Sequence, residues 1–231
     1  PFVRRILHWG GSGLALAGFV FVMFRLHSYW IDLDFSRIGQ PVWVLIVILV
    51  FTYGSANVLL ALGWWHLLRH LGSVLPRIRS IKIYGTSQLA KYVPGNIFHL
   101  AGRQALGMAE GVSSSVLVKS TIWELGLIGI AGSLFGWLIL PLAVPGFPEF
   151  ASTLLLLGSA THIVVFLRIK FGYQTVCTFL WQILFLVISG AVFVILLIAI
   201  ADGAEVIMRN GMIIGGAYIF AWLVGLVTPG A

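Results

Sequence analysis

One stretch of the sequence combines cationic and hydrogen-bonding side chains with a helix-breaking dipeptide, and it lies between long apolar runs. This stretch covers residues 88–103 and contains Pro94-Gly95. Proline has no backbone N–H and glycine adopts backbone angles that other residues avoid, so a helix should break here. A new helix starting near Asn96 would direct its unpaired N–H groups and its positive dipole end towards the break, where an anion binds favourably. The chemistry expected here is recognition of a phosphate-sized anion.

The side chains around the break suit the same purpose. Asn96, His99 and Arg103 follow one another at helical spacing on one face, and Lys91 lies one turn before the break. The alternative is that Lys91 and Arg103 extend towards the lipid headgroups and that Pro94-Gly95 is an ordinary loop. The two interpretations differ in whether these cations face a cavity within the protein.

Two ionisable residues, Lys119 and Glu124, occur inside the next apolar run. Because a charged group at the bilayer centre costs about 2.5–3.5 kcal/mol, both are expected to face the protein interior. A separation of five residues puts them on different sides of a helix, so Glu124 needs another partner, either Arg103 or Lys91. Glu124 is then a counter-ion or proton carrier for a transported anion. The alternatives are a structural ion pair and, for Lys119, an interfacial anchor.

Other side chains offer weaker candidates for chemistry. Asp32 and Asp34 could hold a divalent cation or act as a base in a membrane glycosyltransferase that uses a polyprenyl-phosphate sugar, although they also suit a turn or a helix cap. His66 and His70 are four residues apart but are expected to be interfacial rather than metal ligands. The single cysteine, Cys177, excludes an internal disulfide. We expect no metal and no cofactor.

The composition indicates which elements position these residues. Of the 231 residues, 60% are hydrophobic and 9% are charged, and the mean hydropathy is +1.04. Soluble domains are roughly 25% charged, so this is an integral membrane protein, with residues 1–231 forming a single membrane domain whose termini look trimmed. The net charge of +7 does not indicate nucleic acid, because the basic residues cluster where apolar runs end.

The fold class expected is all-α, a polytopic helical membrane protein with about five full spans and two broken or re-entrant segments at Pro94-Gly95 and Pro229-Gly230. The full spans are predicted at residues 6–24, 42–68, 113–140, 149–167 and 175–200. The arm at 81–92 would be about 18 Å long, too short for the roughly 30 Å hydrocarbon core. A hairpin that enters and leaves by one side is therefore expected, and irregular backbone at that depth implies a cavity.

The loops carry their positive charge asymmetrically, which predicts the orientation. One side would collect Arg4, Arg5, Arg69, Arg77, Arg79, Lys82, Arg168 and Lys170, and the other Arg25, Arg37 and Arg209. The first side, with the N-terminus, is therefore expected to be cytoplasmic. The two Pro-Gly segments would then approach the midplane from opposite faces, an arrangement that serves transporters.

Several motifs carry a family resemblance. They are Lys91-Tyr92-Val93-Pro94-Gly95-Asn96, Gly102-Arg103, residues 107–112, Trp123-Glu124 and the closing residues 225–230. With these motifs the chain resembles the lysylphosphatidylglycerol synthase transmembrane-region family, of the flippase-domain type. The resemblance implies a polytopic bacterial or archaeal membrane protein that moves or handles a lipid with a charged head. Lipid aminoacylation is not expected, because the chain shows no soluble synthase region.

The sequence thus predicts a lipid flippase or lipid transporter of the bacterial inner membrane rather than an enzyme, with an anionic headgroup bound at the bilayer midplane. The predicted contacts are Lys91, Tyr92, Pro94, Gly95, Asn96, His99, Arg103, Glu124, Pro229 and Gly230. The alternatives are the glycosyltransferase and a non-catalytic membrane partner of a lipid- or polysaccharide-modifying enzyme. A homo-oligomer or a partner enzyme is compatible with this prediction.

Overall fold

The computed structural model describes residue 24 and residues 39–88, 98–201 and 203–227, and every regular element within them is helical. The elements are α2 (Gln40–His70), α3 (Arg77–Gln88), α4 (Phe98–Ala109), α5 (Ser114–Leu134), η3 (Phe135–Ile139), α6 (Leu140–Ala143), α7 (Glu149–Phe171), α8 (Tyr173–Ile200), α9 (Ala204–Arg209) and α10 (Gly211–Val227). This result confirms the all-α class for the described part of the chain.

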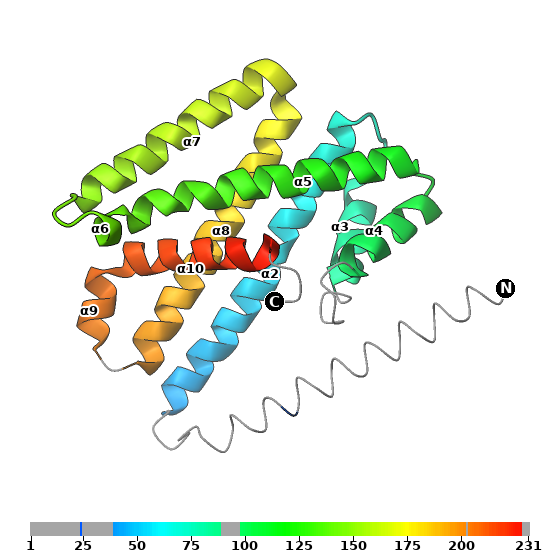
Figure 1. Ribbon diagram of the computed structural model, residues 1–231. Coiled ribbons are helices and arrows are strands. Elements are labelled where there is room, and N and C mark those ends of the chain that lie inside the picture. The colour runs from blue at the N-terminus through cyan, green and yellow to red at the C-terminus, as the bar shows by residue number, and fades with distance from the viewer. Residues whose placement is uncertain (1–23, 25–38, 89–97, 202, 228–231) are drawn as a thin grey trace.

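Four helices are long and apolar enough to cross a membrane: α2, the continuous segment Ser114–Ala143, α7 and α8. They correspond to four of the five predicted spans, and the fifth prediction, at residues 6–24, lies outside the described residues. Pro41 opens α2, as expected, since the first turn of a helix tolerates its missing N–H. Figure 1 shows α2 and α8 side by side, with α5 inclined across them and α7 joined to one end of α8.

The helices α2 and α8 are antiparallel and form the most extensive interface of the structure. Thr178 packs on Gly63 and donates a 2.9 Å hydrogen bond to its carbonyl oxygen. Farther along, the rings of Tyr53 and Phe185 pack with their centres 6.2 Å apart. The absence of a Cβ at Gly63 lets the two backbones approach closely, as small residues do between membrane helices.

The helices α3 and α4 form an antiparallel pair beside one end of α2 and α5 (Figure 1). At one end of the pair Arg79 and Glu110 form a 2.7 Å ion pair, and near the other end Ser87 lies against Gly102. Each helix has 12 residues and is therefore about 18 Å long, shorter than the roughly 30 Å hydrocarbon core. The two connections to α2 and α5 lie at the same end, as expected, whereas the turn at Pro94-Gly95 lies outside the described residues.

The structure corrects one prediction about burial within the third span. Glu124 is buried, but Lys119 is exposed on the surface of α5 and does not face the protein interior. Five residues at 3.6 per turn place the two side chains roughly 140° apart, so burying one of them exposes the other. Lys119 lies in the second turn of α5, near the end of the span and away from the bilayer centre. Its long side chain can therefore reach the headgroup region.

Two predicted loops are largely helical. The basic segment at 168–174 completes α7 and starts α8, with only Gly172 between them at a φ of 86°. Arg168 and Lys170 favour the last turn of a helix because they lie near its negative dipole end. The polar segment after Ile200 includes α9. Glu205 in its first turn and Arg209 in its last turn likewise match the dipole.

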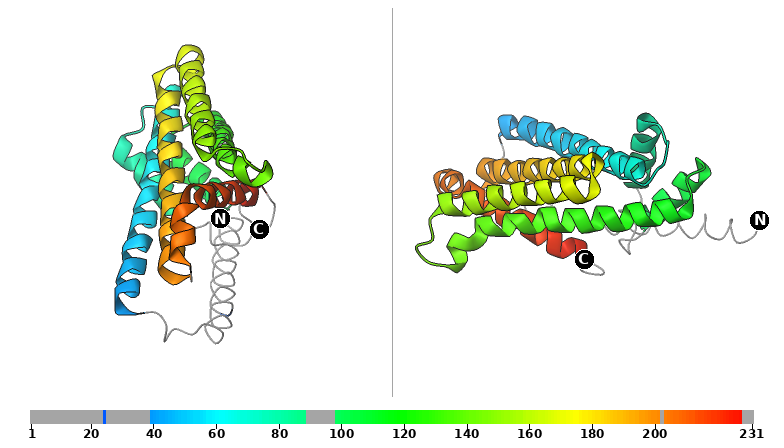
Figure 2. Two further views of the ribbon diagram at one scale, coloured as in Figure 1. Left: turned by 90° about the vertical axis from the view of Figure 1, so that its left-hand side faces the viewer. Right: turned by 90° about the horizontal axis from the view of Figure 1, so that it is seen from above.

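Within the third predicted span α5 is followed by a 3₁₀ segment, η3, and the chain then continues past residue 140 as α6. Pro141 explains the change, since its ring would clash with the carbonyl group four residues earlier in a regular α-helix. Against this segment packs α10, where Gly216 lies close to Leu138 and to the Phe135 carbonyl oxygen. Figure 2 shows α10 (red) along one side of the bundle, where it packs on η3, α8 and α5.

Candidate functional site

A buried ion pair connects α4 to α5 inside the bundle. Arg103 Nη2 lies 2.7 Å from Glu124 Oε2, and Arg103 Nη1 donates a 3.0 Å hydrogen bond to Glu124 Oε1. The exposed fractions of the two residues are 2% and 7%. Glu124 is the eleventh residue of α5, about 15 Å along the axis from its first residue and thus about half of the hydrocarbon thickness. Two opposite charges at this depth stabilise each other where neither would be stable alone.

Aromatic side chains complete the environment of the pair. The Tyr84 hydroxyl donates a 2.8 Å hydrogen bond to Glu124 Oε1. The guanidinium carbon of Arg103 lies 4.6 Å from the centre of the Tyr84 ring and 5.3 Å from that of Trp64. The Trp64 indole N–H in turn donates a 3.0 Å hydrogen bond to the Ser120 hydroxyl. Arg103 is therefore held by a carboxylate and by two ring faces that favour a cation.

A cavity of about 60 Å³ borders this pair. Besides Arg103 and Glu124, its wall includes polar side chains from α2, α3 and α4 and aromatic rings from α8 and α10, namely Asn57, Gln88, His99, Phe185 and Trp222. Since water occupies about 30 Å³ per molecule in the liquid, this space suits one or two waters rather than a lipid headgroup. The space beside the ion pair is therefore smaller than a lipid headgroup.

Buried polar atoms that make no hydrogen bond within the described residues include Arg103 Nε and Gln182 Oε1. Gln182, on α8, uses its amide nitrogen to donate a 3.1 Å hydrogen bond to the Glu124 carbonyl oxygen. Of these two residues Arg103 lines the cavity and Gln182 does not, so Arg103 Nε is the donor that remains available for a ligand there. A bound phosphate would compete with the Glu124 carboxylate for Arg103, because both oxyanions accept paired N–H donors from guanidinium.

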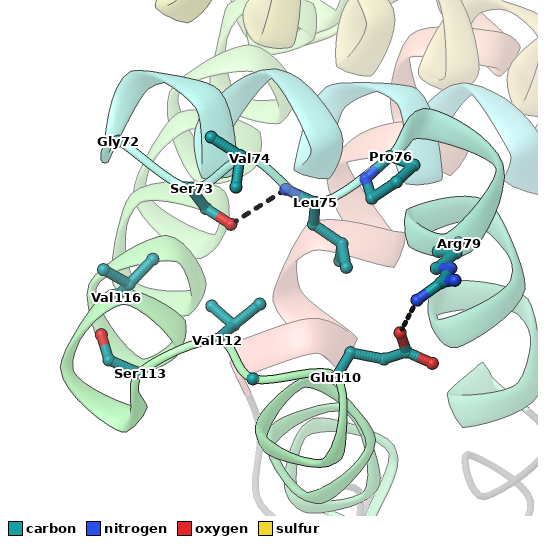
Figure 3. Close-up of a pocket in the computed structure, with 11 residues that line it drawn as sticks. Gly72, Ser73, Val74, Leu75, Pro76, Arg79, Glu110, Val112, Ser113 and Val116 are labelled. Atoms are coloured by element: carbon teal, nitrogen blue, oxygen red, sulfur yellow. Dashed lines mark hydrogen bonds and ion pairs between the residues drawn. The ribbon is translucent and has the colours of Figure 1, made fainter.

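A second, larger hollow lies at the open end of the α3–α4 pair. It has a volume of about 400 Å³ and lies between the connections at residues 72–76 and 110–113. Figure 3 shows Leu75, Val112 and Val116 on its apolar wall and the Arg79–Glu110 ion pair on its rim. Unlike Arg103 and Glu124, these two charged side chains are 63% and 36% exposed. The ion pair on the rim of this hollow is therefore in contact with solvent.

The structure describes three of the predicted contact residues. Arg103 and Glu124 are in contact, which identifies Arg103 as the partner of Glu124, and His99 lines the same cavity. The remaining predicted contacts lie outside the described residues: Lys91, Tyr92, Pro94, Gly95, Asn96, Pro229 and Gly230. Asp32 and Asp34, on which the glycosyltransferase alternative depends, also lie outside them.

The structure adds site residues that were not predicted, chiefly Tyr84, Trp64 and Gln182. Sequence signals existed for two of them. Tyr84, Gln88 and Lys91 follow one another at spacings of four and three residues. In a helix these spacings place the three side chains on one face, which ends at the Pro94-Gly95 break. Gln182 is a polar residue inside a long apolar run, and such residues face the protein interior.

The two histidines of α2 make contacts typical of a helix end. His66 Nδ1 lies 2.5 Å from Gln174 Oε1, and His70 packs edge-on against Trp123. No group of three or more His, Cys, Asp or Glu side chains is placed to hold a metal ion in the described part of the chain.

Comparison with protein families, with characterised proteins and with solved structures finds no significant match to the chain. The resemblance to the lysylphosphatidylglycerol synthase transmembrane-region family stays a prediction that rests on its motif residues. The case for function therefore depends on the geometry of the site.

Proposed function

We propose that the protein moves a lipid with an anionic headgroup across the inner membrane of a bacterium, and that the Arg103–Glu124 pair forms its headgroup site. The observation that carries the proposal is this ion pair, buried beside a cavity in a bundle with four candidate spans. A structural ion pair needs no cavity, and a snorkelling arginine would be exposed. A pathway for a charged group across the membrane requires charged and polar side chains inside the bundle. The ion pair and the Asn57, Gln88 and His99 side chains supply them within an otherwise largely apolar cavity wall.

The Arg103–Glu124 pair provides a means of binding and release. In the closed arrangement Glu124 neutralises Arg103, so no uncompensated charge is buried. A lipid phosphate entering the cavity would replace Glu124 as the partner of Arg103, with Arg103 Nε as a further donor. Glu124 would then turn towards the water that enters with the headgroup. Return of Glu124 to Arg103 would release the lipid.

The α3–α4 pair is the element that would move, as a re-entrant hairpin entering from the cytoplasm. Its connections to α2 and α5 contain Gly72 and Gly111, with φ angles of 82° and 83°. These two glycines allow each connection to turn sharply. Since the cavity is too small for a headgroup, a displacement of α4 that carries Arg103 away from Glu124 would enlarge it. The acyl or prenyl chains would stay in the surrounding lipid.

The described positive charges support a cytoplasmic position for the open end of this hairpin. At that end of the bundle lie Arg69, Arg77, Arg79, Lys82, Arg168 and Lys170. The opposite end carries Glu149, Glu205 and Arg209. An excess of Lys and Arg in short loops marks the cytoplasmic side of a membrane protein.

The proposal is tested by reconstituting the full chain into sealed vesicles and following the exchange of labelled lipids between leaflets. The lipids to compare are phosphatidylglycerol, phosphatidylcholine and a polyprenyl phosphate. We expect exchange of at least one anionic lipid by the unaltered protein and its loss in Arg103→Gln. The matched control is Arg79→Gln, which removes one guanidinium from the exposed ion pair of the same hairpin.

Folded protein is identified by size-exclusion chromatography and by its helical circular dichroism. Arg103→Lys is a second variant, since it keeps the charge but loses the two-pronged contact. Failure of the folded, unaltered protein to exchange any of these lipids would contradict the proposal. So would undiminished exchange by folded Arg103→Gln.

A further inference from the structure

Two arginines meet over one tryptophan ring at the end of α2. The guanidinium carbons of Arg69 and Arg77 lie 5.1 Å and 5.9 Å from the centre of the Trp65 ring. Trp65 follows Trp64 in the chain but is only partly buried, and the two consecutive indoles contact different cations. Trp64 contacts the buried Arg103, whereas Arg69 and Arg77 are exposed.

The cluster continues from α2 to α8 through rings that pack edge-on. His66 packs edge-on against Trp65, and Tyr173 packs edge-on against His66, with ring centres 4.8 Å and 6.5 Å apart. Beyond Tyr173 lies the Arg168 guanidinium, 5.8 Å from the ring centre. Three arginines from α2, α3 and α7 thus flank a row of three aromatic side chains. We call these six residues the basic-aromatic band: Arg69, Arg77, Trp65, His66, Tyr173 and Arg168.

No described carboxylate neutralises the band. The ion pairs among the described residues are Arg79–Glu110 and Arg103–Glu124, and neither includes Arg69, Arg77 or Arg168. The rings hold the guanidiniums in place from one side, which leaves their N–H donors free for an oxyanion. Arginines fixed close together without an acid create a positive potential that attracts an anion.

The position of the band identifies the source of that anion. It lies at the ends of candidate spans α2, α7 and α8, beside apolar side chains that are exposed, including Phe166 and Ile169 at 50% and 75%. Tryptophan and tyrosine at the end of a span belong at the depth of the headgroups, and Lys and Arg at this depth attract anionic lipids. A phosphate at this depth is that of a lipid.

We infer that the basic-aromatic band is a binding site for the phosphate of an anionic phospholipid in the adjacent leaflet. The inference goes beyond the proposed function, because the band lies at the surface end of the helices and shares no residue with the Arg103–Glu124 cavity. The bound lipid would be an annular ligand that fixes the depth and tilt of α2, whatever lipid the cavity carries.

The test is lipid binding by the purified full chain in neutral detergent, measured by native mass spectrometry. Phosphatidylglycerol, phosphatidylcholine and inorganic phosphate are each titrated. We expect selective retention of phosphatidylglycerol and a loss of affinity of roughly tenfold or more in the double variant Arg69→Gln/Arg77→Gln. The control Arg79→Gln/Lys82→Gln removes the same charge from α3 outside the band and should lower this affinity by a smaller factor than Arg69→Gln/Arg77→Gln does. Trp65→Leu keeps all charges and should give an intermediate loss.

Three results would overturn the inference: equal retention of phosphatidylcholine, undiminished phosphatidylglycerol affinity in Arg69→Gln/Arg77→Gln, or displacement of the lipid by inorganic phosphate at equal concentration. An equal loss in both double variants would also overturn it, because net charge alone would then explain binding. Arg103→Gln should retain phosphatidylglycerol at the band even though we expect it to abolish leaflet exchange. The two proposals can therefore fail independently.

Discussion

The Arg103 guanidinium and the Glu124 carboxylate, 21 residues apart in the chain, meet in a two-pronged contact with distances of 3.0 Å and 2.7 Å. One partner belongs to the short helix α4 and the other to the long helix α5. The buried charges of Arg103 and Glu124 therefore compensate each other only while α4 is packed on α5. Any movement of α4 away from α5 must find another partner for each charge.

Removing one member of this pair should destabilise the protein strongly, because the other charge is left buried. We expect Arg103→Leu and Glu124→Leu each to cost about 3–5 kcal/mol, and the double variant Arg103→Leu/Glu124→Leu to cost less than either. Unfolding in mild detergent, followed by circular dichroism, gives the double-mutant cycle. The same cycle on Arg79 and Glu110 is the control and should give a coupling of about 0–1 kcal/mol, since that pair is solvated.

Additive effects of the two substitutions at Arg103 and Glu124 would contradict this picture. They would mean that each charge has other compensation, such as water or a lipid phosphate retained from the membrane. Repeating the cycle after exhaustive removal of lipid distinguishes these cases, because a coupling energy that rises on removal of lipid indicates a lipid partner.

The sequence allowed one half of this site to be predicted and not the other. A carboxylate inside an apolar run needs a cationic partner, so Arg103 was one of two candidates for Glu124. The choice between Arg103 and Lys91 depends on the packing of α4 on α5, which periodicity does not specify. Tyr84 and Trp64 were not predicted, because aromatic residues are common in apolar helices and only tertiary contacts reveal which of them hold a cation.

Adding one methyl group at Gly216 should destabilise the contact between α10 and η3. A Cβ there would lie 2.7 Å from Leu138 Cβ and 3.2 Å from the Phe135 carbonyl oxygen, neither of which can turn away. We expect Gly216→Ala to cost about 1–3 kcal/mol, as overpacking usually does. Gly225→Ala is the control in the same helix, because nothing lies within 4 Å of that Cβ. It should be neutral or stabilising by up to about 1 kcal/mol.

Thermal unfolding of both glycine variants in one detergent measures the difference. Equal melting temperatures would show that α10 is displaced from η3 without cost. The prediction concerns the fold alone, so it holds whether or not the protein moves lipids.

The hydrogen bond from Thr178 to the Gly63 carbonyl should contribute to the α2–α8 interface. Thr178→Val keeps the shape of the side chain and removes the donor, at a cost of about 0.5–1.5 kcal/mol. Thr161→Val is the matched control on the exposed side of α7, where the hydroxyl bonds only within its own helix. The free energy of unfolding in detergent should therefore fall for Thr178→Val alone. An equal fall in both variants would show that the interhelical hydrogen bond adds no more stability than a hydrogen bond within one helix.

Hydropathy predicted the long helices well but the connections poorly. The predicted spans at 42–68, 149–167 and 175–200 differ from α2, α7 and α8 by a few residues at their ends. The differences arise where polar residues continue a helix, as Arg168 and Lys170 do in α7, because helix-forming tendency does not require an apolar side chain. Lys119 shows a related limit: a charge inside an apolar run can lie at its edge, where the chain reaches water.

The orientation of the bundle is open to direct measurement with single cysteines. Cys177 is the only cysteine of the chain, so Cys177→Ser provides a cysteine-free background. In this background Val74→Cys and Val144→Cys each replace an exposed valine in a connection between helices. The two valines lie near opposite ends of the segment Ser114–Ala143. Because the Val74 end carries the excess of Lys and Arg, it should lie in the cytoplasm. A membrane-impermeant maleimide should then label Val74→Cys in inverted vesicles and Val144→Cys in right-side-out vesicles, with both labelled after permeabilisation. The reverse pattern would overturn the proposed orientation, and labelling of both from one side would contradict a crossing by the segment Ser114–Ala143.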